Sequence, residues 1–358
     1  MGREIRVIHY GVGPIGAGIA RLLLEKPNVR IVGAIDIDPA KVGQDLGFLI
    51  GSGRGLGVTI SDRLNSVLRT GADVVVHCTS SRLCDVEEQL FQCIDSRISV
   101  VSTCEELVYP FHRYPELSDR LDRAARAGRV AILGAGVNPG FLMDRLVLTL
   151  ASACQRVDTI TAKRIVDAKE RRLPLQKKVG AGLSPDEFSA RVASGEIKHH
   201  GLPESIAMIA DSLDLRLEEI QETIEPAIAD AEVCTEFLKV QPGEVAGIKQ
   251  TARGRKGDKE IIRLELDIYV GASEPRDEVQ IGGLPDLHCS FPGGLHGDLA
   301  TAAIVVNSIS PLLEAAPGLR TLRDLPVSYF TGRASGECFP RRSEGRRVGR
   351  IPLVGGGG

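Results

Sequence analysis

The sequence lacks tryptophan, and aromatic residues of all kinds make up only 4% of its 358 residues. It also lacks long apolar runs and an N-terminal segment with the apolar core and cleavage site of a secretory signal, so neither a membrane span nor export is expected. Neither sign of charge dominates, because 44 basic and 47 acidic residues leave a net charge of −3. This balance gives no electrostatic support for a nucleic-acid or membrane partner. These absences predict a cytoplasmic protein.

Cysteine is present, but not in a pattern that indicates metal or disulfide chemistry. The eight cysteines include no CxxC pair and no Cys/His cluster at metal-ligand spacing, so no metal site is predicted. Cys78, Cys93, Cys104 and Cys154 stand in apolar stretches. We interpret them as reduced core residues.

Glycine is abundant, and its most informative cluster opens the chain. Residues 5–16, IRVIHYGVGPIG, place an apolar strand before Gly11, Gly13, Pro14, Ile15 and Gly16. In a dinucleotide-binding turn, the first glycine allows a sharp bend, the second lets the backbone approach a pyrophosphate, and the third brings the following helix close. Apolar spacing predicts that helix from about Pro14 to Glu25. The pattern alone is equally that of a structural turn.

The next apolar strand, VRIVGAIDID, ends near Asp36, which stands twenty residues beyond Gly16. A carboxylate there binds the ribose hydroxyls of NAD and repels the 2′-phosphate of NADP. Asp36 therefore favours NAD, while Lys41 leaves NADP open. Thr79 and Ser80 follow the third strand of the alternation and are expected to line the same cofactor site.

Strands and helices alternate over the first part of the chain, and the strands are continuously apolar, which is typical of parallel sheets. We predict an α/β protein with a Rossmann-type doubly wound parallel sheet over residues 1–137. Residues 45–58 are expected to form a glycine-rich loop, and a helix over 116–128 is expected to be closed by Gly128. Polar and apolar residues alternate in EIIRLELDIYVGA, which predicts a second α+β domain over 138–295 with an open, largely antiparallel sheet. Residues 296–335 are predicted to return to the first domain as a helix and segment, and 336–358 to form a mobile tail.

Two adjacent acids, Glu105 and Glu106, follow a buried strand in VVSTCEELVYP. They stand at the edge of the sheet where ligands bind. Consecutive residues there point in different directions, so one of them is expected to face the cleft. A carboxylate in an apolar cleft can exchange protons near neutral pH. A solvated acid pair at a helix start would produce the same pattern.

Long, particular motifs then extend over nearly the whole chain: GVGPIG, STCEE, GAGVNPGF, RIVDAKERRLPLQKKVGAG, HHGLPESIAMIAD, GEVAGIKQ and HGDLATAAIVVNSI. With these motifs the sequence resembles the 2,4-diaminopentanoate dehydrogenases and the native NAD(P)-dependent amine dehydrogenases, whose N-terminal domain is shared with dihydrodipicolinate reductases. The resemblance implies reductive amination of a carbonyl compound with ammonia, the reverse oxidative deamination, and a homodimer formed through the second domain's sheet. It implies that Glu105 is the catalytic acid/base. It also implies a substrate pocket formed by Asn138, Phe141, Arg164, Leu175, His199 (or its neighbour His200) and Thr301.

Three other interpretations stay open. RIVDAKERR lacks the Pro-Ser-Gly-Thr continuation of dihydrodipicolinate reductases, which counts against a cyclic-imine reductase. A true 2,4-diaminopentanoate dehydrogenase would need Arg164 or Lys163 for the charged end of an amino acid. The third alternative is a non-catalytic NAD-binding regulator. Residue by residue, Arg164 could instead be half of a structural ion pair, and Asn138 could simply shape a turn.

Overall fold

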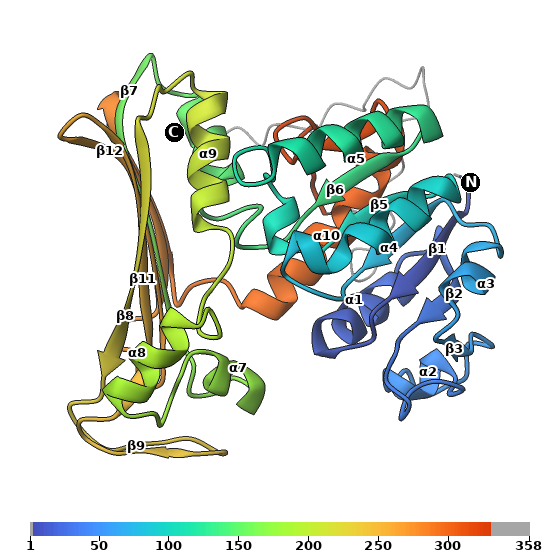
Figure 1. Cartoon of the computed structure of the whole chain (residues 1–358), viewed down its shortest axis with the longest axis horizontal. Helices are drawn as coiled ribbons and strands as arrows, with labels where there is room; N and C mark the ends of the chain where they lie inside the picture. The colour runs from blue at the N-terminus through green and yellow to red at the C-terminus, as the bar shows by residue number, and fades with distance from the viewer. Residues whose placement is uncertain (1–2, 331–358) are drawn as a thin grey trace, which may run out of the picture.

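The computed structural model describes residues 3–330, and the predicted tail at 336–358 lies outside this range. Two lobes stand side by side (Figure 1). The first holds a seven-stranded parallel sheet in the order β15-β6-β5-β4-β1-β2-β3. Its strands are β1 (Ile5–Tyr10), β2 (Val29–Ile35), β3 (Ile60–Ser61), β4 (Val74–His77), β5 (Ser99–Ser102), β6 (Ala131–Gly134) and β15 (Gly318–Arg320). The strand order reverses between β1 and β4, the switch point at which doubly wound sheets bind ligands.

Helices cover both faces of this sheet, as continuously apolar strands require. Side chains of α1 (Pro14–Leu24) and α10 (Gly297–Glu314) pack into the core on one face. Those of α3 (Leu64–Leu68), α4 (Leu83–Asp95) and α5 (Pro115–Gly128) pack into the core on the other. Val305, Ile309 and Leu312 of α10 are buried with strand residues of the first lobe. Sequence periodicity did not indicate β15, which pairs in parallel with β6.

The second lobe is built on a six-stranded sheet in the order β14-β13-β7-β12-β11-β8. Its strands are β7 (Arg156–Asp167), β8 (Glu219–Ile228), β11 (Val245–Lys256), β12 (Lys259–Tyr269), β13 (Arg276–Leu284) and β14 (Leu287–Pro292). Only β7 and β12 pair in parallel, so the prediction of an open, largely antiparallel sheet is confirmed. The alternation in β12 places Ile262, Leu264 and Leu266 in the core.

The remaining elements of the second lobe are α6 (Arg145–Ala151), α7 (Leu173–Lys178), α8 (Pro185–Ala193), α9 (Leu202–Ser212), β9 (Val233–Cys234) and β10 (Lys239–Val240). Ser184 caps the N-terminus of helix α8, and Pro185 stands in its first turn. Helix α9 lies along one face of the large sheet, and within residues 3–330 the opposite face carries no helix (Figure 1).

Two local predictions were wrong. Residues 45–58 contain a short helix, α2 (Leu46–Leu49), because the Asp45 carboxylate accepts a hydrogen bond from the Gly47 N–H at its start and others from residues 56–58. Helix α5 runs through Gly128, and Arg129 takes the left-handed conformation with φ of 56°. A Cβ at residue 128 would lie 3.1 Å from the Ile94 carbonyl oxygen, a tight contact that favours glycine there.

All seven cysteines within residues 3–330 are free thiols. Cys93 and Cys104 are buried, and burial raises the pKa of Cys93 to about 12. Cys78 and Cys154 are half-buried. In the same range no helix is long and apolar enough to cross a bilayer, and no group of three or more His, Cys, Asp or Glu side chains could hold a metal ion.

Candidate active site

The glycine turn after β1 has the shape of a phosphate cradle. Gly11 has φ of +93°, and a Cβ there would lie 2.3 Å from the Cys78 carbonyl oxygen. A Cβ on Gly16 would lie 1.9 Å from the Gly11 carbonyl oxygen, so both positions admit only glycine. A Cβ on Gly13, by contrast, would meet nothing within 4 Å. The open space beside Gly13, at the N-terminus of α1, therefore fits a pyrophosphate. Pro14 and Ile15 form the first turn of that helix.

Asp36 braces this turn from the end of β2. Its carboxylate accepts hydrogen bonds from the N–H groups of Val12 (2.7 Å) and Asp38 (2.9 Å) and from Lys41 Nζ (3.1 Å). Burial acts to raise the pKa of Asp36, but these three donors outweigh burial and hold the pKa below its usual value. Asp36 is therefore ionised, and Lys41 offsets its charge. Lys41 also lies 3.4 Å from Asp38.

Thr79 and Ser80 follow β4, directly beside the glycine turn. The Thr79 hydroxyl donates to Gln89 Oε1 at 2.8 Å and lies 3.0 Å from His77 Nε2. The Ser80 hydroxyl donates to Asp85 at 2.9 Å. Both hydroxyls are hydrogen-bonded within the protein, so it is the backbone groups of Thr79 and Ser80 that are left for a ligand at this edge of the parallel sheet.

The adjacent glutamates have different surroundings. Both belong to the short 3-10 helix η1 (Glu105–Leu107) that follows β5. Glu106 is 2% exposed, and its Oε2 accepts hydrogen bonds from the Leu83 N–H and the Tyr114 hydroxyl, each at 2.8 Å. Glu105 is half-buried, and its Oε2 is buried without a hydrogen-bond partner. Glu105 is therefore the acid with a carboxylate oxygen available to a ligand.

The two adjacent histidines have different neighbours. His200 Nδ1 lies 3.2 Å from Glu106 Oε1. The backbone of His199 is held by Gln250, at 3.0 Å through its N–H and 2.7 Å through its carbonyl, while its buried Nδ1 has no hydrogen-bond partner. Burial first, and then the nearby cations Lys178 and Arg164 and the His200 ring, lower the pKa of His199, against the opposing charge of Glu105. His199 is therefore a neutral imidazole close enough to Glu105 to respond to its charge.

Asn138 lies on the loop after β6, and both polar atoms of its buried side-chain amide lack a partner. The loop is held by Thr301 of α10, whose Oγ1 accepts from the Val137 N–H at 3.2 Å. It packs against the end of the histidine segment, since a Cβ on Gly201 would lie 2.3 Å from Pro139 Cγ. Unpartnered polar atoms thus occur on three neighbouring segments that follow β5, follow β6 and precede α9.

The other predicted pocket residues are placed differently. Arg164 is 4% exposed, and its guanidinium donates to the Asp277 carboxylate at 3.0 Å and to the Leu295 carbonyl oxygen at 2.6 Å. These contacts are those of a structural ion pair. Phe141 is half-buried and packs against the core of the second lobe. Leu175 is half-buried on α7.

Two further residues hold the site together, and the sequence reasoning missed both. Asp144 is fully buried and joins the Asn138 loop to α9, because it accepts from the Gly140 N–H at 2.6 Å and from the Ser205 hydroxyl at 2.9 Å. Its position directly before α6 is a recognisable N-cap signal. Gln250, which holds His199, is a polar residue at an inward position of an alternating strand, and that exception to the pattern was its signal.

A doubly wound parallel sheet with an open phosphate cradle at its switch point defines a dinucleotide-binding protein. Residues 141–334 match the 2,4-diaminopentanoate dehydrogenase C-terminal domain, and residues 5–104 match the dihydrodipicolinate reductase N-terminus. The chain therefore belongs to the 2,4-diaminopentanoate dehydrogenase family. It is an oxidoreductase that acts on CH–NH2 donors.

Three relatives share its full extent. The chain is 30% identical over 349 residues to a 2,4-diaminopentanoate dehydrogenase of Acetoanaerobium sticklandii, covering 90% of this chain and 94% of that protein. It is 26% identical over 356 residues to an amine dehydrogenase of Streptomyces virginiae, covering 92% and 98% of the two chains. The solved structure of an amine dehydrogenase from Mycobacterium smegmatis superposes with a TM-score of 0.82 at 30% identity, covering 91% and 97%.

Proposed function

We propose that the protein catalyses NAD(P)-dependent reductive amination of a ketone or aldehyde with ammonia, together with the reverse oxidative deamination, and that Glu105 is its catalytic acid/base. The observation that carries the proposal is the unpartnered carboxylate oxygen of Glu105, near the neutral imidazole of His199. A buried acceptor without a partner is rare in folded proteins, and a ligand is a common reason for one. The family membership supports the same chemistry.

A bound nicotinamide dinucleotide supplies the hydride for amination and accepts it in deamination. The carboxylate of Glu105 stabilises the positively charged iminium carbon–nitrogen group, because opposite charges attract strongly where water is excluded. It takes protons from ammonia as the C–N bond forms and returns them as water leaves. Asn138 offers one acceptor and two donors to the reacting nitrogen or oxygen. Phe141 and Leu175 are proposed to limit substrate size, and Arg164 and Thr301 to complete the pocket walls.

The test combines activity with cofactor binding. NADH is mixed with ammonium and a panel of ketones and aldehydes, and absorbance of the reduced cofactor is followed. Glu105→Gln is expected to lose at least about 100-fold in turnover while NADH titrates normally, and Glu116→Gln, at an exposed acid of α5, is the matched control. A Glu105→Gln enzyme with most of its activity contradicts the proposal. NADH oxidation without ammonium would indicate a ketone reductase, and none with any carbonyl would indicate a regulator.

A diamino acid is a second candidate substrate, because positive charge surrounds His199. Lys178 and Arg164 both act on its imidazole, and a substrate carboxylate would be attracted to the same place. Arg164 is already paired with Asp277, which leaves Lys178 as the available cation. Lys178→Ala should then raise KM for amines that carry a carboxylate and not for neutral amines. Lys177→Ala, at the neighbouring exposed lysine, is the control.

For the cofactor, NAD is the proposed preference and NADP a tolerated alternative. The ionised Asp36 disfavours a 2′-phosphate, while Lys41 at 3.1 Å from its carboxylate supplies a compensating charge. Asp36→Ala is a poor test of this preference, because it would also release the Val12 N–H and with it the glycine turn.

A homodimer and a cytoplasmic location complete the proposal. The sheet face of the second lobe that no helix of the described residues covers (Figure 1) offers a broad surface for a second copy, and light scattering would measure the mass in solution. The free thiols of the described residues are compatible with a reducing compartment.

A further inference from the structure

We infer that Glu106 is a positioning residue: with Arg113, His200 and Glu204 it forms a charged clamp between the lobes that sets Glu105 opposite His199. The inference rests on the proposed function of Glu105. Glu106 and Arg113 belong to the first lobe, whereas His200 and Glu204 belong to the second. We call these four residues the clamp.

The clamp is a chain of close contacts between buried charges. Arg113 lies between two carboxylates, with Nε 2.7 Å from Glu204 Oε1 and Nη1 3.6 Å from Glu106 Oε1. His200 Nδ1 approaches Glu106 Oε1 at 3.2 Å. The side chains of Glu106 and Glu204 are only 2% and 1% exposed. Because an unpaired charge is costly when buried, these contacts tie the relative placement of the lobes to charge pairing.

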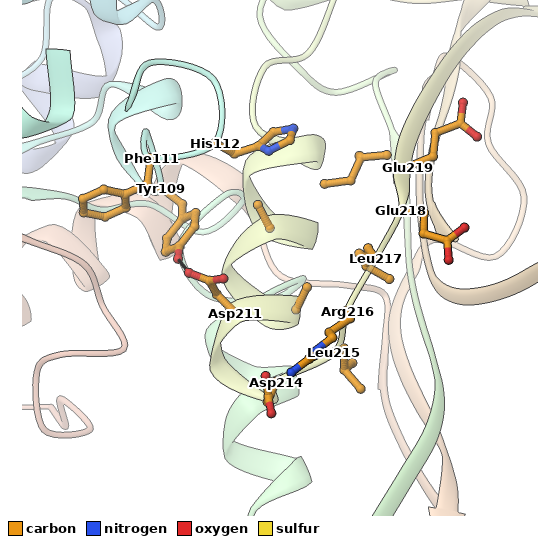
Figure 2. Close-up of a pocket in the computed structure, with 13 residues that line it drawn as sticks. Tyr109, Phe111, His112, Asp211, Asp214, Leu215, Arg216, Leu217, Glu218 and Glu219 are labelled. Carbon is orange, nitrogen blue, oxygen red and sulfur yellow. Dashed lines mark hydrogen bonds between the residues drawn. The ribbon is translucent and has the colours of Figure 1, made fainter. Parts of the chain in front are cut away.

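The same two segments are also joined by apolar packing further along α9. Tyr109 is buried against Ala207 and Met208, and its hydroxyl donates a hydrogen bond to the Asp211 carboxylate (Figure 2). Glu204 and Asp211 are seven residues apart, so they lie on one face of α9 about two turns from each other. The segment from Tyr109 to Arg113 therefore lies along α9 and is attached at both ends, beside a groove of about 470 Å³.

Because Glu106 and His200 directly follow Glu105 and His199 in sequence, the contact between them also positions Glu105 and His199. Glu105 precedes Glu106, and His199 precedes His200, so pairing the second member of each set across the lobes leaves the two first members near each other. The histidine segment has little freedom of its own, since Lys198 pairs with Glu222 at 2.5 Å and Gln250 holds the backbone of His199. An error of about 1 Å in the position of a catalytic group can cost about 100-fold in rate. The clamp supplies the placement that Glu105 needs.

Glu106 has several charged neighbours. Arg113 and His200 face Glu106, and Arg82, the Cys104 thiol and Glu204 are within electrostatic range. A neutral side chain at this position would leave these groups without their carboxylate and would loosen the placement of the neighbouring Glu105. A positioning role therefore predicts a lower kcat at unchanged cofactor affinity, whereas a purely structural role would lower stability alone.

The test compares Glu106→Gln with a variant at the far end of the same interface. Glu106→Gln keeps the shape of the side chain and is expected to lower kcat about tenfold or more, with the NADH Kd within about twofold of wild type. Glu106→Asp restores the charge at a shorter reach and should recover part of the melting temperature but not kcat. Tyr109→Phe removes only the hydrogen bond to Asp211 and should lower the melting temperature without changing kcat.

Should Glu106→Gln fail to fold, His200→Gln serves instead, because the His200 side chain is 17% exposed and its loss leaves Arg113 on Glu106. Wild-type kcat in the folded variant would overturn the inference, as would an equal loss of kcat in Tyr109→Phe. The two proposals fail separately: an active Glu105→Gln enzyme removes the role of Glu105, whereas an active Glu106→Gln enzyme beside an inactive Glu105→Gln enzyme removes only the clamp.

Discussion

Lowering the pH should decrease the free energy of unfolding of this protein, because Glu106 becomes protonated. Burial acts to raise the pKa of Glu106, but His200, the Leu83 N–H and the Tyr114 hydroxyl outweigh burial and lower the pKa from 4.5 to about 2. Because the folded-state pKa is the lower one, the stabilisation is complete above pH 4.5 and is lost as pH falls toward 2. A difference of roughly 2.5 units corresponds to about 3 kcal/mol at neutral pH.

The measurement is thermal unfolding of wild type and Glu106→Gln, followed by circular dichroism because the chain has no tryptophan. At pH 7 the variant should melt at least about 5 °C lower, and the gap should shrink below pH 4.5 as wild type loses its advantage. Glu204 acts in the opposite sense, because burial raises its pKa, but it is present in both proteins. A gap of constant size from pH 7 to pH 3 would refute the reasoning.

Three further outcomes follow from packing and charge. Gly13→Ala should fold normally and bind NADH about tenfold more weakly or worse, because its Cβ enters the open phosphate cradle. Gly16→Ala should instead lose about 1–3 kcal/mol of stability or more, because its Cβ collides with the backbone of the turn. Equal melting temperatures for the two variants would count against this geometry. Arg164→Ala should cost about 3–5 kcal/mol, because it leaves the buried Asp277 carboxylate without its partner, and a variant as stable as wild type in denaturant titration would show the ion pair to be unimportant. Lys41→Ala should weaken NADP more than NAD in fluorescence titrations, and equal losses would remove Lys41 from the choice of cofactor.

Much of the fold was predictable because its strands have clear periodicity. The strands of the first lobe are continuously apolar and those of the second alternate, so each sheet type follows from burial on two faces or on one. β15 escaped prediction because Gly318–Arg320 is too short to display any period. The cap of α5 was misjudged because glycine commonly takes the left-handed position after a helix, while here Arg129 takes it and Gly128 lies in tight contact with Ile94.

The sequence could propose the residues of the candidate site, but not the contacts that these residues make. The motif could indicate two glutamates and two histidines, but not which neighbours each of them has. Tyr114 and His200 contact Glu106, whereas one carboxylate oxygen of Glu105 is buried without a partner. Local sequence carries no record of the contact between Glu106 and His200, so it could not distinguish the two acids.

The first lobe contains residues from both the early and the late part of the chain, and this arrangement affects how the lobe folds during synthesis. On the ribosome, one face of the first sheet is covered only by α1 until α10 emerges, and the outer edge of β6 stays unpaired until β15 follows. Truncation before α10 should therefore yield an aggregating fragment, not an independent nucleotide-binding module. By contrast, the chain leaves the first lobe before α6 and returns to it after β14. The stretch from α6 to β14 is therefore the segment to exchange between relatives when building chimaeras.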